Sequence, residues 1–330
     1  MRDYNYSRPL DVHRWSNFPE VNTFIDKLYD NNIKNVSENA KIQKKHLKLV
    51  LLDLFIAWTD DPELNIGVHM HEGAYSDGTV FNKGKSRYNE LNIKVSTIKV
   101  VHRLRDLGFI GFKKGYEGSV EYAPRLSRIW GKDKLIKLFK DAAFSYFDIN
   151  YSKDREVVIL RNEDKVDLEY EDNETTEAMR ELLHKYNELL RTTFIDIPEL
   201  DIPRIELKEK KKRRRRNKPV FVNISHHDKF TRRIFNNSTF EEGGRFYGGW
   251  WQRVDESHRK RIRLNNLPTV EIDYSALHVI LAYTEIDEDY WKLTDKDPYR
   301  VPIDGINNPE HIRDINKLFF LLSLNASNEI

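Results

Sequence analysis

The spacing of apolar and polar positions predicts both helices and strands in the first half of the chain. Apolar residues recur three and four positions apart over 41–58, which predicts an amphipathic helix. A shorter helix is expected over 21–30, and the stretch 60–85, which is rich in Gly, Asp and Asn, is expected to form loops with short extended pieces. The pattern therefore predicts an α+β chain.

The stretch 86–127 has the clearest order of elements. A short helical turn precedes Ser96, which is a good N-cap for a helix that ends before Gly108. Two strand-like runs then follow, 109–114 and 120–124, around a turn that contains two glycines. Helix, turn, helix and hairpin is the order of a winged helix-turn-helix.

Basic side chains on this predicted domain are candidates for contacts with nucleic-acid phosphates. The helix offers Lys99 and Arg103, and the hairpin offers Lys113 and Lys114. DNA, or alternatively RNA, is therefore an expected partner. The same order of elements also occurs in small domains that bind only protein, so that alternative stays open.

Further along the chain the pattern predicts a helix over 132–147, a strand over 157–160 and a helix over 174–190. We expect the winged-helix-like domain to span 1–147 and a helical connector to span 148–218. The net charge of +2 hides strong charge blocks in this connector. Eight of the fifteen residues in 163–177 are acidic, and eight of the nine in 208–216 are basic.

The basic block can be a solvated loop, a phosphate-binding segment or a nuclear localisation signal. Its candidate nucleic-acid-binding residues are Lys212, Arg213, Arg214 and Arg215.

The remainder, 219–330, contains the candidate chemistry. In 243–252, glycines flank large aromatic side chains and Arg245, so the backbone can approach a ligand while rings offer stacking surfaces. Alternatively this is a Gly-rich hairpin whose Trp residues are core. Apolar and acidic residues alternate over 270–273, which predicts a strand ending at Asp273, and a helix is expected from Ala276. A carboxylate at the end of a strand can bind a hard divalent cation.

A second helix, expected over 309–325, places Arg313 and Lys317 one turn apart on one face. The sequence EIDYSALH at 271–278 resembles motif A of family A DNA polymerases, and Arg313 with Lys317 resembles the start of motif B. Asp297 lies between them, where that family often has a short Asp-containing stretch. The resemblance covers about a third of the chain, and it implies a palm and fingers portion in 219–330.

The resemblance implies specific roles for these residues. Asp273 would bind the catalytic Mg²⁺, and the carbonyl of Tyr274 could reach the same ion. Arg313 and Lys317 would neutralise the triphosphate of a bound nucleoside triphosphate. His278 stands where the family usually has a Glu that senses the sugar, and Arg245 would lie beside template or primer. The implied activity is template-dependent nucleotidyl transfer in the replication of a mobile element, plasmid or phage.

The chain ends before any place for motif C, whose carboxylate completes the two-metal site. We therefore expect either a longer gene product or a catalytically silent relative. The alternative function is a DNA-binding replication initiator or transcription regulator without catalysis. The sequence has no cysteine and no apolar stretch long enough to span a membrane, which fits a cytoplasmic chain. The histidine pairs at 69/71 and 226/227 lack a third ligand at zinc-site spacing.

Overall fold

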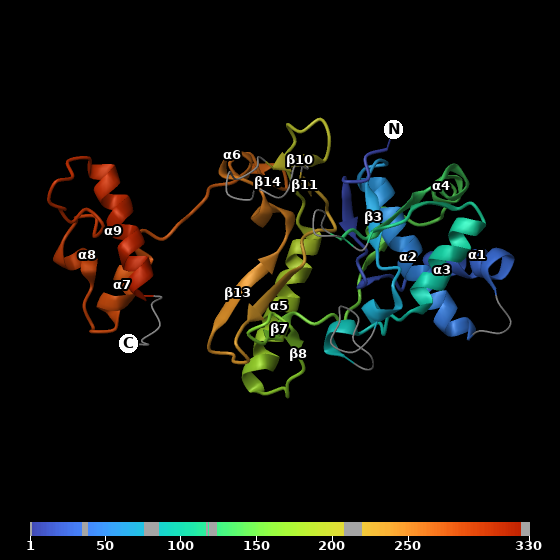
Figure 1. Cartoon of the computed structure of the whole chain (residues 1–330), viewed down its shortest axis with the longest axis horizontal. Coiled ribbons are helices and arrows are strands. Elements are labelled where there is room, and N and C mark those ends of the chain that lie inside the picture. Colours follow the sequence, from blue (N-terminus) through green and yellow to red (C-terminus); the bar gives the residue numbers. More distant parts are fainter. Residues whose placement is uncertain are drawn as a thin grey trace. The chain divides into compact units, whose positions relative to one another are not determined.

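The computed structural model describes residues 2–34, 39–75, 86–116, 118, 124–207 and 220–324. The chain divides into two compact units, Met1–Thr269 and Val270–Ile330, and its fold is mixed α and β with several small sheets (Figure 1). Within the described ranges, no helix combines the length and apolar character needed to cross a membrane.

The first part of unit 1 is built on a four-stranded sheet in the order β1-β3-β5-β4. Its strands are β1 (Ser7–Pro9), β3 (Asn65–Val68), β5 (Ser127–Gly131) and β4 (Ile110–Lys113). Strand β1 runs parallel to β3, whereas β5 runs antiparallel to both β3 and β4. Thus β5, the last strand in sequence, lies between β3 and β4.

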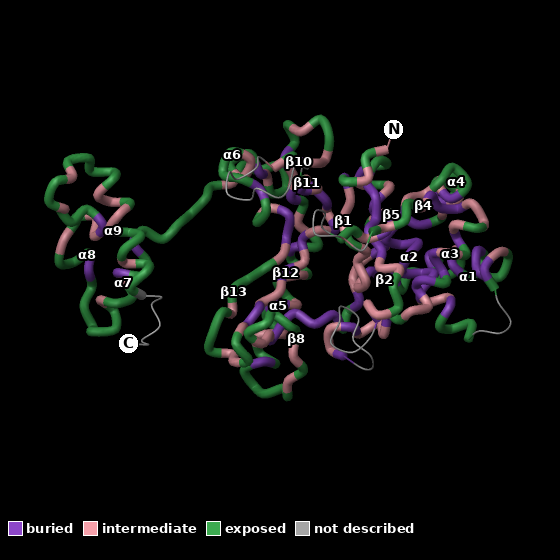
Figure 2. Tube along the Cα trace, viewed as in Figure 1, coloured by how far each residue is buried: buried purple, intermediate pink, exposed green. Residues whose placement is uncertain are grey.

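Helix α2 (Ala40–Asp60) lies at the centre of the largest hydrophobic core. Every residue from 46 to 57 is buried, and Figure 2 shows the buried positions concentrated along this helix. The helices around it are α1 (Pro19–Leu28), the π-helix Tyr29–Ile33, α3 (Ser96–Asp106) and α4 (Asp133–Lys140). The predicted 41–58 helix is confirmed.

Three details of the predicted helix and hairpin differ. Ser96 is the first residue of α3, and Val95 before it makes no side-chain cap. The second strand is β5, further along than expected, while most of the expected strand 120–124 lies outside the described residues. The expected helix 132–147 ends at Lys140, and a 3₁₀ turn follows at Tyr146–Asp148. Gly108 does adopt the expected left-handed conformation, with φ of 75°.

The second part of unit 1 contains another four-stranded sheet, in the order β13-β12-β7-β8. Helix α5 (Glu174–Thr192) packs against β12 and β7. The predicted strand 157–160 and helix 174–190 are therefore confirmed. The strands of this sheet are β13 (Gly243–Gly248), β12 (Thr231–Phe235), β7 (Val158–Arg161) and β8 (Asp167–Leu168).

Short strands form three smaller sheets in the same unit. The pairs are β2 (Arg14–Trp15) with β6 (Asn150–Tyr151), and β10 (Arg204–Leu207) with β11 (Val220–Asn223). The third sheet has the order β15-β14-β9, comprising β15 (Leu267–Pro268), β14 (Arg263–Leu264) and β9 (Ile195–Asp196). The turns Glu72–Tyr75, Arg87–Asn89 and Trp250–Arg253 are 3₁₀, and α6 is Glu256–Arg259. Trp250 is fully buried in a second core beside Ile197 and Val222.

Unit 2 consists of α7 (Leu277–Thr284), α8 (Tyr290–Leu293) and α9 (Pro309–Leu324). Its small core contains Val279, Tyr290 and Tyr299. The predicted strand over 270–273 is wrong, because this stretch has no regular structure. Val270 and Ile272 are 86% and 90% exposed, so their alternation with acidic residues does not mark a buried face. The helices predicted to begin at 276 and 309 are confirmed as α7 and α9.

Buried His46 connects α2 to the segment before α3. Its burial predicts that the fold becomes less stable at acidic pH. Its Nδ1–H donates to the Ile42 carbonyl at 2.8 Å, and its Nε2 accepts the Lys94 N–H at 2.9 Å. Burial lowers the pKa of His46 to about 4 from 6.5. Because the unfolded chain then binds more protons between these values, stability falls as the pH drops from 6.5 to 4.

The substitution His46→Gln should reduce that pH-dependent loss of unfolding free energy by roughly 2–3 kcal/mol. Urea unfolding at pH 7 and pH 4 measures the difference for each variant. His71, which is exposed, provides the matched control His71→Gln, which should leave the pH dependence as in the wild type. An unchanged dependence in His46→Gln would contradict the assignment.

Candidate functional site

Four basic side chains surround a cavity of about 390 Å³ at the β4–β5 hairpin. No acidic side chain lines it in the part of the chain that the structure describes. We call these four residues the basic hairpin: Lys113, Lys114, Arg125 and Arg128. Burial, and secondly the neighbouring Arg125, lower the pKa of Arg128. Cations gathered at a cavity that no described carboxylate lines favour an anionic ligand.

The backbone explains how these cations come together. Tyr116 and Arg125 form an antiparallel bridge beyond the ends of the two strands. A Cβ at Gly115 would lie 2.4 Å from the Arg125 carbonyl oxygen, so this close approach requires glycine. Lys113 and Lys114 were predicted from the sequence, whereas Arg125 and Arg128 were missed because the second strand was expected before them.

Helix α3 carries the other two residues of this domain that were predicted to contact nucleic-acid phosphates. Lys99 and Arg103 are exposed and stand four residues apart on the helix. The Arg103 guanidinium donates to the Asn32 carbonyl at 3.0 Å, so it also fastens α3 to the end of the π-helix. The predicted residues Lys212, Arg213, Arg214 and Arg215 lie outside the described residues.

A cluster of lysines near the start of α3 was missed in the sequence. Lys45 donates to the Asn92 carbonyl at 3.2 Å. Its pKa is lowered by burial and then by the charges of Lys94 and Lys41, so each of these two lysines acts on the Lys45 ammonium group. The four-residue spacing of Lys41 and Lys45 can be seen in the sequence, but the approach of Lys94 to Lys45 depends on the tertiary fold.

The Gly-rich aromatic segment forms strand β13 and the turn after it. Arg245, Phe246 and Tyr247 are exposed, whereas Trp250 is core, as the alternative interpretation of this segment expected. A Cβ at Gly248 would lie 1.9 Å from the Phe230 carbonyl oxygen. The glycine is therefore needed for the close pairing of β12 with β13.

In unit 2, Asp273 is exposed, and its Oδ1 accepts the N–H of Tyr274 at 2.9 Å. Arg313 donates to Asp297 at 2.7 Å, and this ion pair raises the pKa of Arg313. Lys317 is exposed. No hydrogen bond or ion pair joins Asp273 to either cation in the part of unit 2 that the structure describes.

Tyr274 and His278 are exposed as well. Among the described residues, no group of three or more His, Asp or Glu side chains is placed to hold a metal ion. A two-metal site needs more than one carboxylate. Magnesium binding and nucleotidyl transfer therefore stay predictions.

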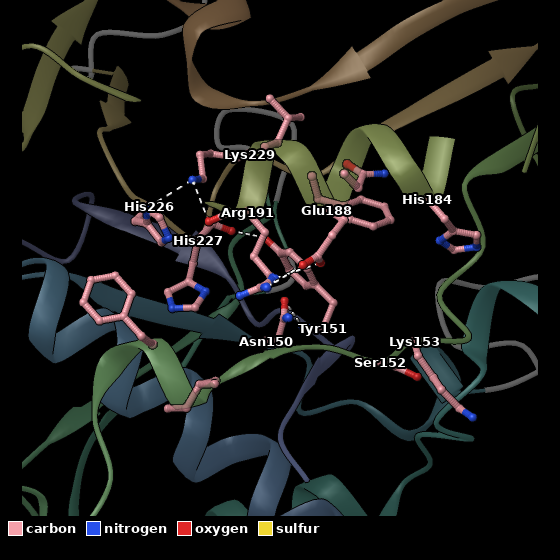
Figure 3. A pocket seen from close by; sticks show the side chains of 15 residues that line it. Asn150, Tyr151, Ser152, Lys153, His184, Glu188, Arg191, His226, His227 and Lys229 are labelled. Atoms are coloured by element: carbon pink, nitrogen blue, oxygen red, sulfur yellow. Dashed lines mark hydrogen bonds and ion pairs between the residues drawn. The ribbon is translucent and has the colours of Figure 1, made fainter. Parts of the chain in front are cut away.

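A second cavity, of about 350 Å³, lies beside α5 (Figure 3). The Lys229 ammonium donates to the Thr193 carbonyl at 2.6 Å and lies 3.1 Å from Nδ1 of His226. Burial lowers the pKa of Lys229 to about 8 and that of His226 to about 4. These groups bond to one another and to the end of α5, so they fasten the segment before β12 to that helix.

Neither a family model, nor a curated protein, nor a solved structure matches this chain.

Proposed function

We propose that this chain binds double-stranded nucleic acid through a winged-helix subdomain formed by α2, β3, α3, β4 and β5. The observation that carries the proposal is the basic hairpin, where four cations surround one cavity that no described carboxylate lines. Such a hairpin is suited to phosphate contacts, because each phosphate that is neutralised releases condensed counterions.

The order of the elements supports the same proposal. A helix, a strand, the 3₁₀ turn Arg87–Asn89 and helix α3 precede the hairpin, and the strands lie in the order β3-β5-β4. A winged helix-turn-helix has its elements in a similar order, and the second helix of that motif enters the major groove. Helix α3 would take that place in the proposed complex, and its Lys99 and Arg103 are exposed.

The lysine cluster adds a third region of phosphate contact. Lys41, Lys45 and Lys94 lie where α2 begins and α3 is about to begin. Phosphate contacts fix the register of a protein on the duplex but carry no base sequence information. The proposed binding is therefore dominated by electrostatics and should weaken steeply as salt is raised.

Removing three cations of the basic hairpin should weaken duplex binding about 10- to 100-fold at 100 mM salt. The variant is Lys113→Ala, Lys114→Ala, Arg125→Ala, and fluorescence anisotropy of a labelled duplex over a salt series measures the affinity. The slope of log affinity against log salt should become shallower by about 3, since each lost phosphate contact removes about 0.9.

The matched control removes three exposed lysines at helix α4: Lys132→Ala, Lys137→Ala, Lys140→Ala. This variant loses the same charge, but from residues that are not part of the proposed interface. It should therefore reduce the affinity for the duplex only slightly and leave the salt slope close to that of the wild type. An equal loss of affinity in both triple variants would show that net charge alone matters, and the proposed interface would be wrong.

A further inference from the structure

A third cavity, of about 470 Å³, is lined by five arginines and three carboxylates from widely separated parts of unit 1. The charged lining residues are Arg8, Arg14, Arg155, Arg232, Arg253, Asp11, Asp60 and Asp228. Its volume falls in the range of about 300–1,000 Å³ that is usual for small-ligand sites. Neither the proposed duplex interface nor the resemblance to polymerases assigns it a role.

Three of the five arginines are already paired with carboxylates. Arg8 contacts Asp53 at 2.8 Å, Arg14 contacts Asp11 at 3.1 Å, and Arg253 pairs with Asp228. Asp60 accepts hydrogen bonds from Tyr146 and Ser225, and burial raises its pKa.

Arg155 and Arg232 have no carboxylate partner among the described residues. Burial lowers the pKa of Arg232, and the charges of Arg155 and Arg161 lower it further. Asp167 and Asp11 offset part of this effect on Arg232, but neither Arg155 nor Arg232 forms an ion pair with a described carboxylate.

Several guanidinium nitrogens at the cavity also lack an acceptor among the described residues. Nη1 of Arg14, Nη1 of Arg155 and Nε of Arg232 are buried, and no described residue accepts a hydrogen bond from them. The residues Arg14 and Arg155 are only 2% and 9% exposed. Buried donors on charged groups are almost always satisfied, so three of them around one cavity indicate an acceptor that occupies it.

Aromatic rings hold the guanidinium groups in place. The Arg155 guanidinium lies 3.7 Å from the ring centre of Phe230 and 4.6 Å from that of Tyr151. Arg14 lies 5.1 Å from the same Tyr151 ring, whose hydroxyl donates to the His227 carbonyl. Cation–π contacts of this kind orient the charged groups before a ligand arrives, which reduces the entropy lost on binding.

We propose that this arginine cavity binds a phosphate monoester. A phosphate monoester carries a charge of about −1.5 to −2 at neutral pH, and Arg155 and Arg232, which form no ion pair with a described carboxylate, can pair with it. Its oxygens accept from guanidinium groups that approach from several directions. Tyr247 and the backbone of Gly248 and Gly249 also line the cavity, and they offer a stacking surface and room for an attached nucleoside.

The phosphate monoester can belong to a free nucleoside 5′-monophosphate, or it can be the 5′-phosphate at the end of a nucleic-acid strand. Calorimetric titrations of the full chain with inorganic phosphate, with deoxyadenosine 5′-monophosphate and with a short single strand distinguish these sources. The single strand is used in two forms, with a 5′-phosphate and with a 5′-hydroxyl. We expect the 5′-phosphate form or the mononucleotide to bind at least about tenfold more tightly than the 5′-hydroxyl strand, since hydrogen bonds to charged groups contribute that much.

The variant Arg232→Gln should abolish this preference for phosphate. Arg245→Gln is the matched control, because Arg245 lies on the paired strand β13 but is exposed and does not line the cavity. Circular dichroism verifies that each variant is folded, and Arg155→Lys provides a second variant in the cavity that keeps the charge but loses the planar fork.

The triple variant of the basic hairpin separates this inference from the duplex interface. It should weaken binding of both single strands by the same factor and leave their ratio unchanged. A wild-type protein that binds neither phosphate nor the mononucleotide, and does not distinguish the two strands, would show that the cavity holds water only. A preference that persists in folded Arg232→Gln and Arg155→Lys would equally overturn the assignment.

Discussion

The substitution Asp53→Ala should lower the unfolding free energy of unit 1 by about 3–5 kcal/mol. Asp53 is completely buried on α2 and accepts two hydrogen bonds from Arg8, each of 2.8 Å. It also accepts the Asp11 N–H at 3.0 Å and lies 3.5 Å from Nε of Arg14. Removing the carboxylate leaves two largely buried guanidinium groups with less compensating charge, which is more costly than losing a single hydrogen bond.

Urea denaturation followed by tryptophan fluorescence measures this loss. The matched control is Asp26→Ala, which removes a carboxylate of the same type from an exposed ion pair with Lys44. Exposed pairs contribute about 0–1 kcal/mol, so the control should stay close to the wild type. If the two variants lose similar stability, the Asp53 network does not hold β1 and β2 to α2 as inferred.

The elements that could be predicted from the sequence are those whose signals are local. Helix α2 and helix α5 were expected because their apolar residues repeat at the helical period. Gly108 was expected to be left-handed because a helix end needs that conformation directly after its last turn. A helical turn, a helix and a hairpin were expected in this order over 86–127, which is why Lys113 and Lys114 could be placed on a hairpin.

The strand expected over 270–273 shows where local patterns stop being sufficient. Alternation of apolar and polar residues describes a chain that could line one face of a sheet, but a strand also needs a partner strand. No described strand pairs with this stretch, and Val270 and Ile272 remain exposed. The interpretation of Asp273 as a carboxylate at the end of a strand therefore loses its structural basis.

The arginine cavity could not be predicted from the sequence for a different reason. Arg14, Arg155 and Arg232 are more than seventy residues apart, and no spacing rule relates them. They meet because β2 pairs with β6 and β7 pairs with β12. The chemistry of such a site comes from tertiary contacts alone, in contrast to motifs that lie on one helix or one loop.

The substitution Gly248→Ala should destabilise unit 1 by about 3–5 kcal/mol, combining backbone strain with overpacking. Gly248 has a φ of 139°, and a Cβ there would lie 1.9 Å from the Phe230 carbonyl oxygen, so β12 and β13 would have to separate. Gly108→Ala is the control, because Gly108 has a φ of 75° but open space around its Cβ position, and it should cost only about 1 kcal/mol. Thermal and urea unfolding measure both variants. Equal losses would mean that positive φ alone, rather than the contact with Phe230, determines the requirement for glycine at 248.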